Sequence, residues 1–176
     1  MGANSRQWSR TMRDRLGVED PPMQIERAIV DAVVDRYRRE GAPRIEGAVE
    51  AVGRIAAGWP SALASSAHPH VIGAALAATG LTAIFRVVVS SDEVPHGKPE
   101  PDVYLEAARR LGYEPGRCLV VEDSLNGVRA AKRAGMTCVL VPNLTIPPAP
   151  GTAELADLVI DRLADLHPGR LVRSHA

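Results

Sequence analysis

The sequence predicts an α/β fold built on a doubly wound parallel sheet, preceded by a partial helical unit. From residue 46 onward, short apolar runs alternate with helix-type patterns, as in chains that form a parallel sheet with helical crossovers. These runs are apolar on both faces, which is typical of strands covered on both sides. Polar residues follow three of them, at the ends where ligands bind in such sheets.

Two helices are expected before any strand. Residues 5–16 form the first, and residues 23–40 form the second, with apolar residues at helical spacing on one face and charges on the other. Gly41, Ala42 and Pro43 then break the pattern and are a candidate linker. We therefore expect a helical unit over residues 1–41 and an α/β core over residues 42–176.

The core pattern starts with a helix and alternates helix and strand up to residue 142, after which a proline-rich loop leads to a last short strand. The expected helices cover 46–57, 69–79, 100–111 and 125–134, and the expected strands cover 60–64, 84–90, 117–122, 137–142 and 157–160. Serine follows the first strand, Ser90 and Asp92 lie at the end of the second, and a pair of carboxylates ends the third. The carboxyl ends of these strands should therefore form one polar edge.

Composition narrows the classes of partner. The chain has 21 basic and 21 acidic residues, a formal net charge of zero and only 3% aromatic residues, which disfavours nucleic acid and anionic membranes as partners. No run approaches the roughly 18 apolar residues of a membrane span. Cys118 and Cys138 lie in apolar runs and are interpreted as reduced core thiols, so a cytoplasmic location is expected. The sequence does not indicate an oligomeric state.

Glu122 and Asp123 are the first candidate site residues. Two adjacent carboxylates at the mouth of a buried sheet repel each other, and Mg²⁺ relieves this by binding carboxylates together with water and phosphate oxygens. The alternative is that Asp123 or Ser124 simply caps the helix at 125–134.

Lys98, Ser65 and Ser66 are the next candidates. A lysine just before a helix is poorly placed for the helix dipole, so Lys98 makes more sense if it faces an anion; the alternative is a solvated surface lysine. Hydroxyls after a strand and near a helix start, as at Ser65 and Ser66, can hold phosphate or only cap the helix. Serine-hydrolase, Walker and dinucleotide-binding patterns are absent from the sequence.

This set of residues closely resembles three motifs of the haloacid dehalogenase-like hydrolases. The segment from Gly97 to Met136, with GKPEPDVYLEAARRLG and CLVVEDSLNGVRAAKRAGM, is similar to the subgroup of β-phosphoglucomutase, phosphoglycolate phosphatase and sugar-phosphate phosphatases. The resemblance covers residues 2–166 and implies a doubly wound core with a helical cap, of which residues 1–41 would be the later part.

The resemblance also implies roles for the candidate residues. Ser65 would bind the transferred phosphoryl group, Lys98 would neutralise it, and Glu122 and Asp123 would hold Mg²⁺. Asn4, Ser5 and Arg6 align with a cap loop that meets the substrate, so Ser5 and Arg6 are expected to contact it. The expected substrate is a small phosphorylated metabolite, such as a sugar phosphate, and a phosphomutase is the alternative.

One family motif is absent. No Asp-x-Asp occurs in the sequence, whereas in the family the first Asp of this motif is the nucleophile and its strand lies between those expected at 60–64 and 117–122. We interpret the chain as such an enzyme without its N-terminal segment. The alternatives are a shortened paralogue and a non-catalytic remnant that binds phosphate. Unpaired strand edges, marginal stability and negligible phosphatase activity are expected.

Overall fold

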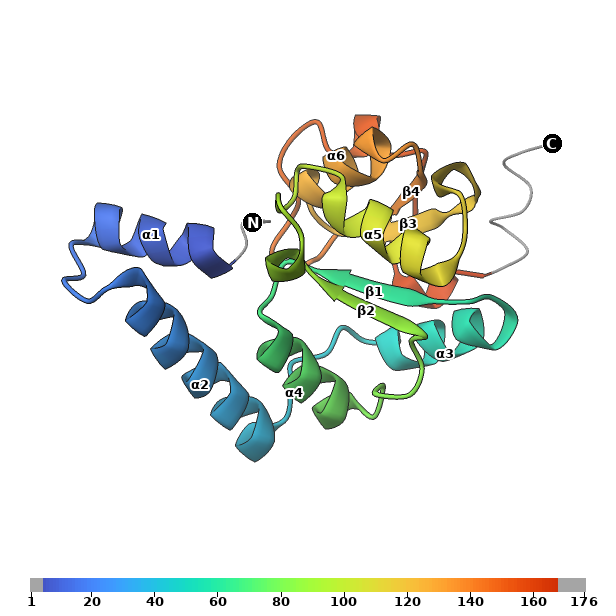
Figure 1. Ribbon diagram of the computed structural model, residues 1–176. Helices are drawn as coiled ribbons and strands as arrows, with labels where there is room; N and C mark the ends of the chain where they lie inside the picture. Colours follow the sequence, from blue (N-terminus) through green and yellow to red (C-terminus); the bar gives the residue numbers. More distant parts are fainter. Residues whose placement is uncertain (1–4, 168–176) are drawn as a thin grey trace.

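The computed structural model describes residues 5–167 and shows an α/β chain (Figure 1). The α-helices are α1 (Ser5–Leu16), α2 (Pro22–Glu40), α3 (Ala48–Gly58), α4 (Pro69–Thr79), α5 (Asp102–Leu111) and α6 (Leu125–Arg133). The strands are β1 (Ala62–Ser65), β2 (Val87–Ser90), β3 (Leu119–Glu122), β4 (Thr137–Leu140) and β5 (Leu158–Val159). The predicted fold class and order of elements are confirmed.

The helices match their predicted ranges closely, whereas the strands are shorter. The run at 84–90 contributes only Val87–Ser90 to a strand, because Ile84 donates its backbone N–H to Leu81 in a preceding turn. The polar segment Ser91–Glu93 forms a short 3₁₀-helix, in which Ser90 and Glu93 make a reciprocal capping box. Capping by polar residues thus ends β2 at the edge where the site lies.

All strand pairs are parallel, but they form two separate sheets. β1 pairs with β2, while β4 lies between β3 and β5. Within residues 5–167 no ladder joins β1 to β3, so each of these strands has one unpaired edge. The expectation that these two strands lack a shared neighbour is confirmed.

One hydrophobic core nevertheless spans both sheets. Val89 of β2, Val120 of β3 and Leu140 of β4 belong to the same buried cluster, against which Ala62 and Ala64 of β1 pack. Helices α5 and α6 supply the other side of this cluster: α5 lies against β1 and β2, and α6 lies against β3 and β4. The two sheets are therefore held side by side by the helices beneath them, and within residues 5–167 no backbone ladder joins them.

Helices α1 and α2 extend away from the core in Figure 1. Helix α2 packs along α4, and the start of α1 is fixed to the core because Ser5 donates its backbone N–H to Asp92 at 3.0 Å and its hydroxyl to the same carboxylate. No helix among the described residues has the length and apolar character needed to cross a membrane.

Candidate functional site

Lys98 lies at the carboxyl edge of the two sheets and is only 7% exposed. Its Nζ donates to Glu122 Oε1 at 2.6 Å and to the carbonyl of Ala64 at 3.3 Å, and it lies 4.6 Å from the centre of the Tyr104 ring. The ammonium therefore joins the end of β1 to the end of β3. The interpretation of Lys98 as a solvated surface lysine is wrong, because a paired and buried cation occupies this position.

The carboxylate of Glu122 is held from several directions. Tyr104 donates its hydroxyl to Oε1, the atom that also receives Lys98, while the Ser124 hydroxyl donates to Oε2 at 3.0 Å. The backbone N–H groups of Asp123 and Ser124 donate to Oε2 at 3.1 and 3.2 Å. Burial favours a raised pKa for Glu122, but Lys98 and these hydrogen bonds outweigh it and hold the pKa below its usual value of 4.5.

Gly127 makes room for this carboxylate. A Cβ atom at this position would lie 1.9 Å from Glu122 Cδ, far inside contact distance. The backbone N–H of Gly127 donates to Ser124 Oγ at 3.1 Å, so Ser124 caps α6 as predicted while its hydroxyl also faces Glu122. The first turn of α6 is thus shaped around the ion pair.

The carboxylate of Asp123 differs from that of Glu122 in its hydrogen bonding. Within residues 5–167 its carboxylate makes no hydrogen bond or ion pair, although its side chain is half-buried at the same edge. A hard carboxylate oxygen suits Mg²⁺, so Asp123 fits a magnesium site. Both oxygens of Glu122 already accept hydrogen bonds, so Asp123 is the better placed of the two predicted ligands.

The predicted phosphate-binding serines lie at the end of β1. Ser65 is paired in register with Ser90 of β2, and its Oγ accepts the backbone N–H of Ala67 at 3.1 Å. Ser90 donates its hydroxyl to the carbonyl of Ala67 at 2.7 Å, which fixes the turn after β1. Ser66 is half-buried in that turn. Ser65 and Lys98 are brought to one edge, since Lys98 binds the carbonyl of the residue before Ser65.

The predicted contribution from the chain start is described only in part. Ser5 is fully buried and its hydroxyl is donated to Asp92. Asn4 and the Arg6 side chain lie outside the described residues. Substrate contact by Ser5 and Arg6 therefore stays a prediction.

Three contributions to the site could not be read from the sequence. Tyr104 and Ser124 donate hydrogen bonds to Glu122, and Gly127 leaves room for its carboxylate. A tyrosine near the start of a helix that follows Lys98, and a glycine in the first turn of α6, were the available signals. A second group was missed as well: ligand atoms of Glu26, His68 and Asp92 lie within 4.8 Å of one another. Their positions in sequence have no metal-binding spacing.

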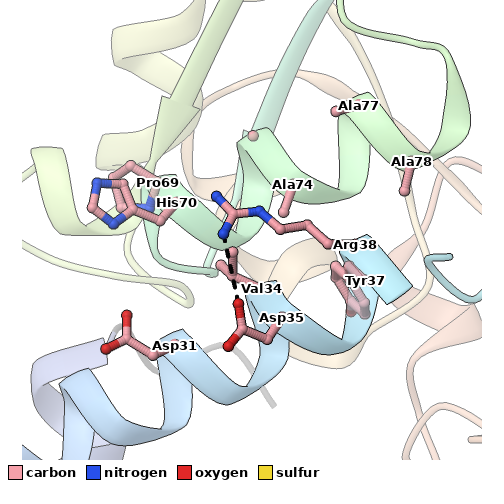
Figure 2. A pocket seen from close by; sticks show the side chains of 11 residues that line it. Asp31, Val34, Asp35, Tyr37, Arg38, Pro69, His70, Ala74, Ala77 and Ala78 are labelled. Carbon is pink, nitrogen blue, oxygen red and sulfur yellow. Dashed lines mark ion pairs between the residues drawn. The ribbon is translucent and has the colours of Figure 1, made fainter. Parts of the chain in front are cut away.

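Two further features lie apart from this edge. Cys118 and Cys138 are free thiols, and burial is the main reason that the pKa of Cys138 is raised to about 12, as expected for unreactive core cysteines. A cavity of about 860 Å³ between α2 and α4 is lined by Val34, by small residues of α4 and by Asp31, Asp35, Arg38 and His70. Figure 2 shows the ion pair between Asp35 and Arg38, which both belong to α2 and line one side of this cavity.

The family model for hydrolases described as haloacid dehalogenase-like matches residues 2–135, about three quarters of the sequence. The chain belongs to this family. Hexitol phosphatase B of Escherichia coli is 34% identical over 145 residues, which cover 81% of this chain and 63% of that protein. The FMN phosphatase and riboflavin kinase of Arabidopsis thaliana is 44% identical over 62% of this chain and 28% of its own.

Solved structures agree with this assignment. CbbY of Rhodobacter sphaeroides in complex with phosphate is 31% identical, with a TM-score of 0.75 over 94% of this chain and 76% of that chain. A hydrolase from Pseudomonas syringae, 24% identical with a TM-score of 0.76 over all of this chain and 80% of its own, supports the fold. The chain spans between about a quarter and two thirds of the length of the first curated relatives.

Proposed function

We propose that the carboxyl edge formed by Ser65, Lys98 and Asp123 is the phosphoryl-binding part of a phosphomonoester hydrolase acting on a small phosphorylated metabolite, such as a sugar phosphate. The buried ammonium of Lys98 carries this proposal, since Glu122 anchors it beside a serine turn and a carboxylate that has no protein partner within residues 5–167. Support comes from relatives named hexitol phosphatase B and fructose-1-phosphate phosphatase YqaB.

Each residue has a separate task in this proposal. The Ser65 hydroxyl donates to one phosphoryl oxygen, and the Lys98 ammonium neutralises the charge that the phosphoryl group carries. Asp123, with or without Glu122, would hold Mg²⁺, which would supply further positive charge to stabilise the bound phosphoryl group. Residues 1–41 act as the helical cap over residues 42–176, and Ser5 and Arg6 contact the rest of the substrate.

The 176-residue chain itself is expected to turn over little substrate. Its sequence has no Asp-x-Asp, so the residues named above bind and neutralise a phosphoryl group without supplying the aspartate nucleophile of the family. This favours one second candidate, a phosphate-binding protein without catalysis. A phosphomutase uses the same residues and remains the alternative named above.

Two measurements on the full chain test the proposal. Calorimetric titration with inorganic phosphate should show binding that is strengthened by Mg²⁺ and lost in Lys98→Met and Asp123→Asn, but kept in the control Asp161→Asn on the exposed surface. Hydrolysis of a hexose phosphate with Mg²⁺ should be negligible. Absence of phosphate binding would overturn the proposed site, whereas robust hydrolysis would overturn only the expected inactivity.

A further inference from the structure

Three side chains that can bind a metal ion meet where helix α2 packs along the core helix α4. Glu26 lies near the start of α2, His68 directly precedes α4, and Asp92 lies in the 3₁₀-helix that follows β2. One ligand atom of each lies within 4.8 Å of the other two, and all three side chains are half-buried. We name these three residues the junction cluster, because they bring one residue of α2 together with two residues of the core.

The members of the junction cluster approach one another without bonding. Among the described residues, no hydrogen bond or ion pair joins His68 to either carboxylate. Around a Zn²⁺ ion with nitrogen and oxygen ligands at about 2.0–2.2 Å, tetrahedral ligand atoms lie about 3.4 Å apart. The spacing of the cluster is close to this value, and rotation of the long Glu26 side chain can close the difference.

The described residues do not balance the negative charge of the cluster. Glu26 makes no hydrogen bond or ion pair with any of them, and the carboxylate of Asp92 accepts only the neutral donors of Ser5. Arg27, next to Glu26 in sequence, pairs with Asp31 at 3.7 Å instead. Two half-buried carboxylates this close repel each other, and a cation bound between them removes the repulsion.

Asp92 is already oriented as metal-ligating carboxylates are. Its two oxygens accept the backbone N–H of Ser5 at 3.0 Å and the hydroxyl of the same residue, which is fully buried. Carboxylates that ligate metals are usually held by such hydrogen bonds, and each oxygen keeps a further lone pair for the ion.

The ring of His68 is held by a weaker contact. Its Nδ1 accepts the backbone N–H of His70 at 3.2 Å on the exposed side of the turn. Coordination through either ring nitrogen gives up this hydrogen bond, because a neutral imidazole has a single nitrogen lone pair. Water can take over the exposed N–H of His70, so the exchange costs little.

We propose that Glu26, His68 and Asp92 bind a divalent cation of the Zn²⁺ type. One imidazole nitrogen and two carboxylate oxygens suit Zn²⁺, which commonly takes three protein ligands and one water. The imidazole disfavours Mg²⁺, which prefers oxygen ligands. The site is distinct from the edge at Asp123, and the bound ion fastens α2 to the segments that follow β1 and β2.

Calorimetric titration of the untagged full chain with Zn²⁺, in excess Mg²⁺, tests the site. Mg²⁺ competes for oxygen ligands such as Asp123, whereas saturable Zn²⁺ binding should persist. Glu26→Gln and His68→Asn should each weaken that binding by at least about tenfold, and Ser5→Ala, which removes one support of Asp92, by about tenfold. Asparagine keeps a capping group at the start of α4.

His96→Asn is the matched control. His96 also lies beside a carboxylate, Asp102 at 3.0 Å, but its side chain is 70% exposed and it belongs to no group of three ligands in the described part of the chain. This variant should bind Zn²⁺ as the wild type does. Equal loss in His96→Asn, or unchanged binding in either Glu26→Gln or His68→Asn, would overturn the site.

Hydrogen exchange shows whether the ion joins α2 to the core. Zn²⁺ should slow exchange of the backbone amides around Glu26 in the wild type and leave them unchanged in Glu26→Gln. Zn²⁺ bound without this protection would place the ion on the core alone and overturn the proposed ligand set. Circular dichroism checks that each variant is folded, and Glu26→Gln remains decisive if His68→Asn is not, because Glu26 has no partner to lose among the described residues.

No saturable Zn²⁺ binding by the wild type would leave the junction cluster as a polar contact between α2 and the core and overturn the proposal. Phosphate binding at Lys98 is measured on separate samples without Zn²⁺. Failure of the cation site would therefore leave the proposed phosphoryl site untouched.

Discussion

Glu122 and Glu106 accept charged hydrogen bonds of nearly equal length in very different surroundings. Glu122 receives Lys98 at 2.6 Å, and the two side chains are 8% and 7% exposed. Glu106 receives Arg109 and Arg110 at 2.7 and 2.6 Å, but the Arg109 side chain is 71% exposed. The lengths alone would rank the two carboxylates as equals. Exposure to water decides how much each ion pair contributes to stability. Removing one partner of a buried pair leaves an uncompensated charge in the interior, whereas water and salt screen an exposed pair.

Gly127→Ala should have the largest effect on stability, because it displaces the buried carboxylate of Glu122 from its hydrogen-bond partners. The added Cβ would lie 1.9 Å from Glu122 Cδ, and Glu122 is held in place by Lys98, Tyr104 and Ser124. We expect the free energy of unfolding in urea to fall by about 4 kcal/mol, as for breaking a buried ion pair. Gly53→Ala is the control, because this glycine is also helical and nothing lies within 4 Å of its added Cβ. Alanine is the better helix former, so the free energy of unfolding of this variant should rise by about 0.5 kcal/mol. Equal effects of the two substitutions would contradict this reading.

Lys98→Met should cost about 3 kcal/mol near neutral pH, because it leaves Glu122 buried without its cation. Lys98 now lowers the pKa of Glu122 and burial raises it, so in the variant this pKa should rise above 4.5. Wild-type protein loses the stabilisation from Glu122 as pH falls through its lowered pKa, whereas the variant gains a proton on folding. The deficit should therefore shrink between about pH 7 and about pH 4.

Urea unfolding at both pH values checks this expectation. Lys132→Met is the matched control, since Lys132 pairs with Asp157 at the same 2.6 Å but is 40% exposed. It should change the free energy of unfolding by less than about 1 kcal/mol. A pH-independent deficit in Lys98→Met would show that lost packing, and not the stranded carboxylate, causes the change.

The same contrast explains how far the sequence could predict the site. Lys98, Glu122 and Asp123 stand in segments whose order along a parallel sheet places them at one edge, so their proximity was predictable. The sequence could not predict which of the two carboxylates, Glu122 or Asp123, binds Lys98. That choice depends on which carboxylate the Lys98 side chain and the first turn of α6 enclose. Strand lengths were overestimated, because apolar runs such as 84–90 include turn residues that resemble strand in composition.

Tyr104→Phe removes one hydrogen bond to Glu122 and keeps the ring beside Lys98. Burial and the neighbouring carboxylate raise the pKa of Tyr104 well above its usual value, so the hydroxyl stays protonated as a donor. We expect a loss of about 1.5 kcal/mol in urea unfolding, as for a hydrogen bond to a charged group. Tyr113→Phe, at a 39% exposed tyrosine, should change little. A loss as large as that of Lys98→Met would mean that the ring has moved.

Glu106→Gln should have the smallest effect, although Glu106 has the larger number of charged donors. Hydrogen bonds from Arg109 and Arg110 lower the pKa of Glu106 to about 2 from 4.5. The carboxylate thus stabilises the fold above about pH 4.5 and loses this contribution as pH falls toward 2. Because Glu106 and its two arginines reach solvent, with Arg109 71% and Arg110 33% exposed, the substitution should be nearly neutral at physiological salt, and any deficit at low salt should vanish on adding salt. A salt-resistant loss comparable to that of Lys98→Met, measured by urea unfolding, would show that burial does not separate the two carboxylates.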